Sequence, residues 1–231
     1  MTPELEAQQE HKALATHTAL AELDAIGADQ GRRLVIGLGS GSTARLFVEA
    51  VAHRIRAGAA WIGVPTSEET RRLAVSLGVP LLDDEGPWSC DVTVDGADEV
   101  SAALDLIKGG GGAHTREKIV NHASRQNVII VDESKLSLRL GERCPVPIEV
   151  LRYGHRETAR RLARFGEVTL RAAETDAANL IADVATGPID EPAQLERQLR
   201  GIPGVVETGL FIQRADVVIV AGARGVQTLR R

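Results

Sequence analysis

The chain has 231 residues and a mass of 24.6 kDa, which exceeds the usual single-core domain of about 100–150 residues and predicts one large domain or two unequal ones. Its net charge of −5 and its two Trp, one Tyr and three Phe argue against a nucleic-acid partner, which requires a positive field and stacking platforms. A polar, acidic N-terminus and apolar runs too short to cross a bilayer predict a cytoplasmic protein with no membrane partner.

Short β-branched runs alternate with helical patterns through most of the chain, which is typical of βαβ units around a parallel sheet. The expected strands of this sheet are 33–37, 61–64, 91–94, 127–131 and 215–220. The expected helices are 4–26, 42–57, one that begins at 66–69 and one that begins near 114. Gly27 is expected to end the first helix, and Thr66 with Glu69 is expected to form a capping box for the third. The sequence therefore predicts an α/β fold.

The pattern changes around Cys144-Pro145-Val146-Pro147, where prolines interrupt the chain. A strand, a helix over 156–165, two strands of which the second covers 179–184, a helix over 192–199 and a strand over 205–212 are expected to follow. This order predicts a small α+β module inserted before the last strand of the parallel sheet.

A glycine- and hydroxyl-rich loop, GLGSGST (37–43), follows the first expected strand and opens a helix. Small residues let backbone amides approach an anion, and the helix N-terminus adds favourable partial charge, so Ser40, Gly41, Ser42 and Thr43 are candidate ligands of a phosphate monoester. The dinucleotide fingerprint would need glycine at position 42, and the P-loop would need a lysine before its Ser/Thr. A strand-to-helix turn that binds nothing is the alternative.

Acidic residues follow the strand that ends in DVTVDGADE (91–99). Ligands of open parallel sheets bind beyond the carboxyl ends of the strands, where Asp95 and Asp98 are expected. Two desolvated carboxylates do not easily both stay ionised, so one of them could act as an acid. An Asp-Gly turn before a helix start is the alternative.

A lysine, four consecutive glycines and a helix start make up KGGGGAHTREK (108–118). Four glycines in a row indicate unusual dihedrals or a backbone that lies against a ligand. Lys108 and Glu117 then place a cation and a carboxylate on either side of this glycine segment; the alternative for Glu117 is a first-turn glutamate that only favours the helix dipole. Lys135, after the next strand, is either a second phosphate contact or a solvated surface lysine.

No metal site is expected. Cys90 and Cys144 form no CxxC pair, and the six histidines show no zinc-ligand spacing.

The combined motifs resemble type A ribose-5-phosphate isomerase. The resemblance rests on segments in the same order and spacing: GLGSGSTA (37–44), PTSEET (65–70), DGADE (95–99), KGGGGAHTREK (108–118), DESK (132–135) and PVPIEV (145–150). The segments IPGVVETGLF and ADVVIVAG extend it over nearly the whole chain.

This resemblance implies a Rossmann-like catalytic domain (1–140 and 214–231) with an α+β lid domain (141–213). It also implies the interconversion of D-ribose 5-phosphate and D-ribulose 5-phosphate through a cis-enediolate, in the non-oxidative pentose phosphate pathway, with no metal or organic cofactor. A homo-oligomer, either a dimer or a dimer of dimers, is expected on the same ground.

Residue roles follow from the resemblance as well. It assigns the proton-transferring base to Glu117, ring opening and hydroxyl protons to Asp95 and Asp98, and the cation beside the developing oxyanion to Lys108. Ser40 to Thr43 match the substrate loop, Gly109, Gly110 and Gly111 its backbone cradle, and Lys135 a binding lysine.

Three positions depart from the family pattern. Ser40 stands where threonine is common, and His114 replaces an apolar residue. The N-terminal helix of the family often carries a lysine that reaches the phosphate, and the alignment of this helix puts His17 near that position, with Lys12 more than a turn away. A phosphate affinity that is either weaker or more sensitive to pH than in the family is therefore expected.

Two other functions fit parts of the sequence. A non-catalytic sugar-phosphate sensor would need the anion loop but not Asp95, Asp98, Lys108 and Glu117 together. An acyl or CoA transferase would need a nucleophilic glutamate, but the sequence contains no extended CoA site. The isomerase is therefore the leading hypothesis.

Overall fold

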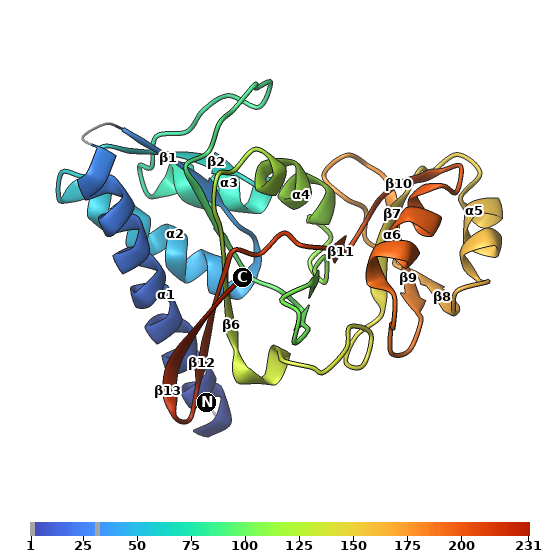
Figure 1. The fold of residues 1–231 in the computed structure, drawn as a ribbon. Helices are drawn as coiled ribbons and strands as arrows, with labels where there is room; N and C mark the ends of the chain where they lie inside the picture. The colour runs from blue at the N-terminus through green and yellow to red at the C-terminus, as the bar shows by residue number, and fades with distance from the viewer. Residues whose placement is uncertain (1–2, 31–32) are drawn as a thin grey trace. The chain divides into compact units, whose positions relative to one another are not determined.

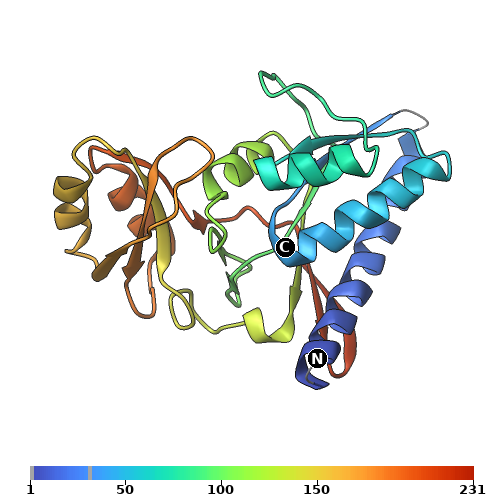
Figure 2. The same ribbon diagram turned by 180° about the vertical axis from the view of Figure 1, so that it is seen from behind.

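The computed structural model describes residues 3–30 and 33–231, and the chain forms two compact units (Figures 1 and 2). Unit 1 comprises Met1–Gly96, Ile119–Ser134 and Ala215–Arg231, and unit 2 comprises Ala97–Lys118 and Lys135–Arg214. The domain boundaries expected from the sequence differ from this division, because they place 97–118 and 135–140 with the parallel sheet.

A six-stranded sheet forms the centre of unit 1, as the α/β prediction requires. Its strand order is β13 (Gly225–Arg230), β12 (Val217–Gly222), β6 (Asn127–Asp132), β3 (Val92–Asp95), β1 (Leu34–Leu38) and β2 (Trp61–Pro65). All neighbours are parallel except β12 and β13, which form an antiparallel hairpin. The five expected strands are confirmed to within two residues, whereas β13 was not expected; its exposed residues carry little apolar signal.

Three helices pack in unit 1. Helix α1 (Pro3–Gln30) contacts β6, β12 and α2 (Gly41–Arg56), and α3 (Glu68–Ser76) contacts α2 and β2. Leu23, Ile36 and Phe47 are fully buried in the core that these elements share. This burial drives the association of the helices with the sheet.

Two predicted helix ends were wrong. Helix α1 does not end at Gly27 but continues to Gln30. One glycine inside a helix costs about 1 kcal/mol, and the tertiary packing of α1 through Leu23 offsets a cost of that size. The N-cap of α3 is Ser67, not Thr66, and its hydroxyl accepts from the Thr70 N–H, so Thr66 and Glu69 form no capping box.

Unit 2 contains two antiparallel sheets. The larger has the order β10 (Val205–Thr208), β7 (Val146–Val150), β9 (Leu180–Ala185) and β8 (Glu167–Leu170), and the smaller has β11 (Leu210–Phe211), β5 (Leu106–Ile107) and β4 (Glu99–Val100). Helices α5 (His155–Leu162) and α6 (Pro192–Arg200) accompany the larger sheet. Helix α4 (His114–His122) follows the glycine segment and belongs to unit 2 up to Lys118 and to unit 1 from Ile119. The expected strand 205–212 is divided in two at Gly209.

No helix in the described residues is long and apolar enough to cross a membrane.

Glu99, the last acid of the DGADE motif, is a structural carboxylate of unit 2. It is fully buried, and its two oxygens accept from the backbone N–H groups of Gly141, Glu142 and Arg143 at 2.9, 3.1 and 3.2 Å. A buried charge needs such donors, and Glu99 thereby fixes the loop that leads into β7.

Replacing Glu99 by Gln puts an amide donor against backbone donors. Because hydrogen bonds to charged groups contribute about 1.5–3 kcal/mol, we expect a loss of unfolding free energy of about 2 kcal/mol. Denaturant unfolding measures it. Glu167→Gln on exposed β8 is the matched control and should change stability by less than about 0.5 kcal/mol; equal effects of the two changes would contradict this role of Glu99.

Candidate active site

The glycine- and hydroxyl-rich loop of unit 1 lies between β1 and α2, as expected. Ser40 is the N-cap of α2; its N–H donates to Asp95 Oδ1 at 3.1 Å, and its hydroxyl lies 2.8 Å from the Thr66 hydroxyl. A Cβ at Gly39 would lie 2.2 Å from Asp95 Oδ1, so only glycine allows this approach. Gly41 has a φ of 84° and is exposed.

Ser42 and Thr43 follow in the first turn of α2 and place their hydroxyls at the N-terminus of this helix. Such a terminus, with unpaired N–H groups and favourable partial charge, is suited to an anion.

Lys12 is the cation of this loop. Its Nζ donates to Ser42 Oγ at 3.0 Å, whereas His17 is exposed on α1. The expectation that His17 rather than Lys12 lies next to this loop is therefore wrong. Position along a helix does not by itself show which residue faces a loop 30 residues away in the sequence.

Asp95 ends β3 and is 3 % exposed. Its Oδ1 accepts from the N–H of Gly96 at 2.8 Å as well as from Ser40. Asp95 therefore contacts the anion loop directly.

Lys108 and Glu117 form a buried ion pair in unit 2. Lys108 Nζ lies 3.1 Å from Glu117 Oε2, and the side chains are 4 % and 7 % exposed. Lys108 directly follows β5, and Glu117 occupies the first turn of α4, so the glycine segment between them brings the two ends together. The Lys108 ammonium also lies 5.6 Å from the centre of the Phe211 ring, a cation–π contact.

The glycine segment itself is held by Asp98. Asp98 Oδ2 accepts from the Gly110 N–H at 2.7 Å, and a Cβ at Gly110 would lie 2.7 Å from Asp98 Oδ1. Gly109 has a φ of 109°, in the region that favours glycine. The structure thus brings Asp98 to Gly110, while Gly111 continues the segment towards α4.

Helix α4 is anchored to β7 and β10 by three side chains that the sequence did not assign to this task. Lys118 Nζ donates to Glu207 Oε1 and Glu196 Oε1 at 3.0 Å each and to the Thr208 carbonyl at 2.8 Å. Thr115 donates to Glu149 Oε2. His114 Nε2 accepts from the Glu149 N–H at 3.2 Å. These contacts fix the helix that carries Glu117.

Lys135 and the two cysteines are the remaining residues that the sequence analysis considered. Lys135 is half-buried at the end of the 3₁₀ turn Glu133–Lys135. Burial raises the pKa of the Cys90 thiol to about 11, and burial together with Glu99 raises that of Cys144 to about 12, so neither is an activated nucleophile.

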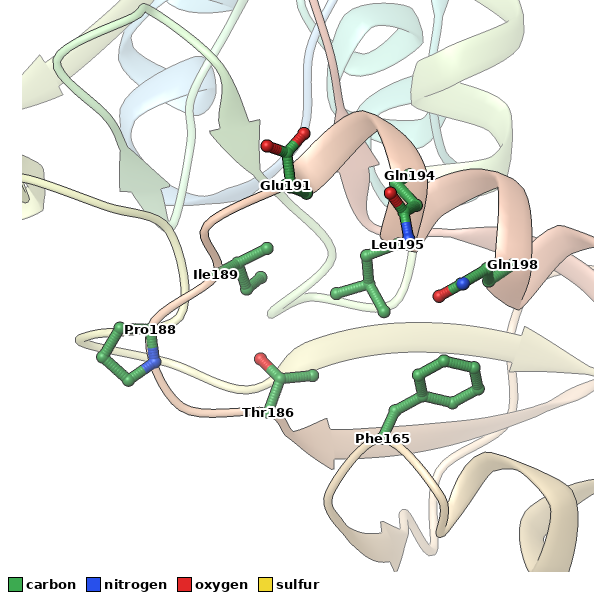
Figure 3. A pocket seen from close by; sticks show the side chains of 8 residues that line it. All are labelled: Phe165, Thr186, Pro188, Ile189, Glu191, Gln194, Leu195 and Gln198. Carbon is green, nitrogen blue, oxygen red and sulfur yellow. The ribbon is translucent and has the colours of Figure 1, made fainter.

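A separate pocket of unit 2 lies between α6 and the segments next to β8 and β9 (Figure 3). Ile189, Leu195 and Phe165 line it with apolar surface, and Gln194 and Gln198 of α6 add amides. None of the site residues expected from the sequence is among those that line it.

The comparison with known families decides the identity. The family described as ribose 5-phosphate isomerase A (phosphoriboisomerase A) matches residues 62–225, more than half of the chain. The chain belongs to the ribose-5-phosphate isomerase A family. A ribose-5-phosphate isomerase A from Synechococcus sp. (strain JA-3-3Ab) is 47% identical over 207 residues, which cover 86% of this chain and 90% of that protein.

Solved isomerases share the fold. Ribose 5-phosphate isomerase A from Methanocaldococcus jannaschii aligns with a TM-score of 0.87 and 38% identity, over 97% of this chain and 100% of the other. A D-ribose-5-phosphate isomerase in complex with phospho-erythronic acid aligns with a TM-score of 0.89 and 36% identity, over 96% and 99%. The resemblance found in the motifs is confirmed: the chain is an isomerase of the pentose phosphate pathway rather than a sensor or a CoA transferase.

We expect His114 to make the stability of this isomerase depend on pH. Burial, aided by the positive charges of Lys118 and Arg171, lowers the pKa of His114 to about 4, although Glu149 and the Glu207 carbonyl favour the protonated ring. The unfolded chain, with an ordinary histidine pKa of 6.5, binds the proton more readily, so folding loses stability as the pH falls from 6.5 towards 4. The pKa difference corresponds to about 3 kcal/mol.

We expect His114→Gln to flatten this part of the stability curve, measured by denaturant unfolding between pH 4 and 7.5. His17→Gln, at an exposed histidine of α1, should leave the slope as in the wild type. A wild-type slope retained in His114→Gln would assign the effect to other groups.

Proposed function

We propose that the loop of unit 1 binds the phosphate of D-ribose 5-phosphate and that the buried Lys108–Glu117 pair of unit 2 moves the proton between C2 and C1. The observation that carries this assignment is the ion pair itself, at 3.1 Å and nearly excluded from solvent. A carboxylate and an ammonium at this depth act in a low effective dielectric, where both interact strongly with a reacting substrate.

The phosphate assignment rests on charge and backbone geometry. The first turn of α2 offers backbone N–H groups and the hydroxyls of Ser42 and Thr43, and Lys12 brings a positive charge to Ser42. Ser40 and Gly41 form the turn before α2, and Asp95 holds this turn by accepting a hydrogen bond from the Ser40 N–H. Lys135 is proposed as a further binding lysine.

The proton transfers balance with one base. Glu117 takes the proton from C2; the C–H electron pair forms the C1=C2 bond, and the C1=O pair moves to O1, giving the cis-enediolate. Glu117 then returns the proton to C1 while the O2 hydroxyl loses its proton to form the ketone and O1 gains one. Lys108 stabilises the negative oxygen, and no cofactor enters the balance.

Asp95 and Asp98 are proposed to open the furanose ring and to handle the hydroxyl protons, with the division between them open. Asp98 is held beside the glycine segment through Gly110, which with Gly109 and Gly111 forms the proposed backbone cradle for the sugar. A pentose phosphate is the proposed small-molecule partner. We also propose that the protein is a cytoplasmic homo-oligomer. Light scattering on the purified protein would measure the mass of the assembly and so the number of subunits.

The role of Glu117 predicts a specific loss in Glu117→Gln. General base catalysis contributes about 10²–10⁴-fold, so kcat should fall by at least that factor, and deuterium from D₂O should no longer enter the sugar. Mass spectrometry of ribose 5-phosphate incubated with the variant measures the exchange. Binding of phospho-erythronic acid, measured by calorimetry, should survive because the phosphate loop is intact.

Glu167→Gln is the matched control, since it makes the same change on an exposed strand. Exchange at the wild-type rate in Glu117→Gln would remove Glu117 from its role as the base.

The proposed role of Lys12 in the phosphate site predicts that its replacement weakens the affinity for the sugar phosphate. A hydrogen bond to a charged group contributes about 1.5–3 kcal/mol, so Lys12→Met should raise KM by about 10–100-fold with little change in kcat. Steady-state kinetics from pH 6 to 8.5 test this, with His17→Ala from the same helix as control. A KM profile that changes in His17→Ala and not in Lys12→Met would restore the histidine as the phosphate contact.

A further inference from the structure

Arg171 holds the carbonyl side of the glycine segment. Its Nε and Nη2 donate to the two carboxylate oxygens of Asp183 on β9, at 2.7 Å each. Its remaining nitrogen, Nη1, donates to the carbonyl oxygens of Gly109 and Gly110 at 2.8 and 2.9 Å. The Arg171 and Asp183 side chains are only 22 % and 18 % exposed, so this guanidinium is largely withdrawn from water.

Because Arg171 Nη1 binds the carbonyls of two successive glycines, it also sets the direction of the N–H groups in the same two peptide units. In a trans peptide the C=O and the N–H point in opposite directions. With the carbonyls of Gly109 and Gly110 both on Arg171, the N–H groups of Gly110 and Gly111 point to the opposite side. The Gly110 N–H confirms this direction, because it donates to Asp98 Oδ2 at 2.7 Å. Adjacent amides turned to one side form a concave site for negative oxygen.

The other face of the segment is equally constrained. A Cβ at Gly109 would lie 2.7 Å from His114 Nδ1, and the φ of 109° at this residue disfavours any side chain. His114 is itself fully buried and tied to β7. The backbone of the segment therefore has little room to rotate while Arg171 keeps its four hydrogen bonds.

We propose that Arg171, held by Asp183, is a positioning residue that turns the Gly110 and Gly111 amides towards Asp98 and the reacting oxygens of the sugar. The inference rests on the proposed function and deepens it, because it names the side chain that gives the backbone cradle its direction. Arginine suits this task because its planar fork binds a carboxylate with two donors and keeps further N–H groups for the carbonyls. A lysine ammonium offers no such fork.

The test compares Arg171→Lys and Arg171→Ala with Arg152→Lys. Arg152 is 58% exposed and pairs with Glu174 in the same unit, which makes it a matched control. Loss of one donor to a developing oxyanion costs about 10²–10³-fold in kcat. We expect Arg171→Lys to lower kcat by about 10–100-fold with KM within about threefold, because the proposed phosphate loop is not changed. Guanidinium chloride at low millimolar concentration should restore part of kcat in Arg171→Ala but not in Glu117→Gln.

A readout independent of turnover separates this inference from the proposed function. In ¹⁵N spectra of glycine-labelled protein, the Gly110 and Gly111 amides should shift and exchange faster in Arg171→Lys than in the wild type, and not in Arg152→Lys. Unchanged amides, or a kcat that falls only with the folded fraction, would overturn the role of Arg171. If the wild type were inactive but the Gly110 and Gly111 amides still changed in Arg171→Lys, the proposed function would be overturned and the positioning role of Arg171 would stand.

Discussion

The buried Lys108–Glu117 ion pair is the interaction on which the rest of the site depends. Removing two charges from water is costly, and their attraction offsets that cost only when the geometry is held closely. Proteins in which both charged residues of a buried pair are replaced by apolar residues of similar volume are often as stable as the original or more stable. A buried pair of this kind is therefore weak evidence for stability, whereas buried and strongly coupled charges are typical of functional sites.

The surroundings of the pair supply that geometry. Phe211 lies under two ammonium groups, 5.6 Å from Lys108 Nζ and 4.9 Å from Lys118 Nζ. Lys118 binds Glu196, Glu207 and the Thr208 carbonyl, so it secures α4 one residue beyond Glu117. Since only Ala113 separates α4 from four glycines, such tertiary contacts rather than the preceding chain hold its first turn in place.

Much of the fold could be predicted because local physics determines it. The five parallel strands are mostly apolar and buried, and the Ser40 loop and the glycine segment are marked by their glycine and hydroxyl residues. Capping and helix ends were less predictable: Ser67 and Thr66 are chemically equivalent caps in the sequence, and only packing selects between them. The hairpin strand β13 has mostly exposed residues, so the apolar pattern did not mark it.

Within the site, predictability fell with separation along the chain. Lys108 and Glu117 stand nine residues apart in one motif, and their pairing could be expected. Arg171 is more than 60 residues from the carbonyls that it binds, and an arginine after a mostly exposed strand gives no signal in the sequence. The contact of Lys12 with Ser42 depends on the rotation of α1 against α2, which no short motif encodes.

The three acids of the DGADE motif show how one short segment separates into distinct tasks. Asp95 accepts from the Ser40 N–H in unit 1, Asp98 from the Gly110 N–H, and Glu99 from three consecutive amides before β7. Each carboxylate thus has backbone donors of its own. The donors that hold Glu99 belong to the loop 141–143, whereas the donor that holds Asp98 belongs to the glycine segment.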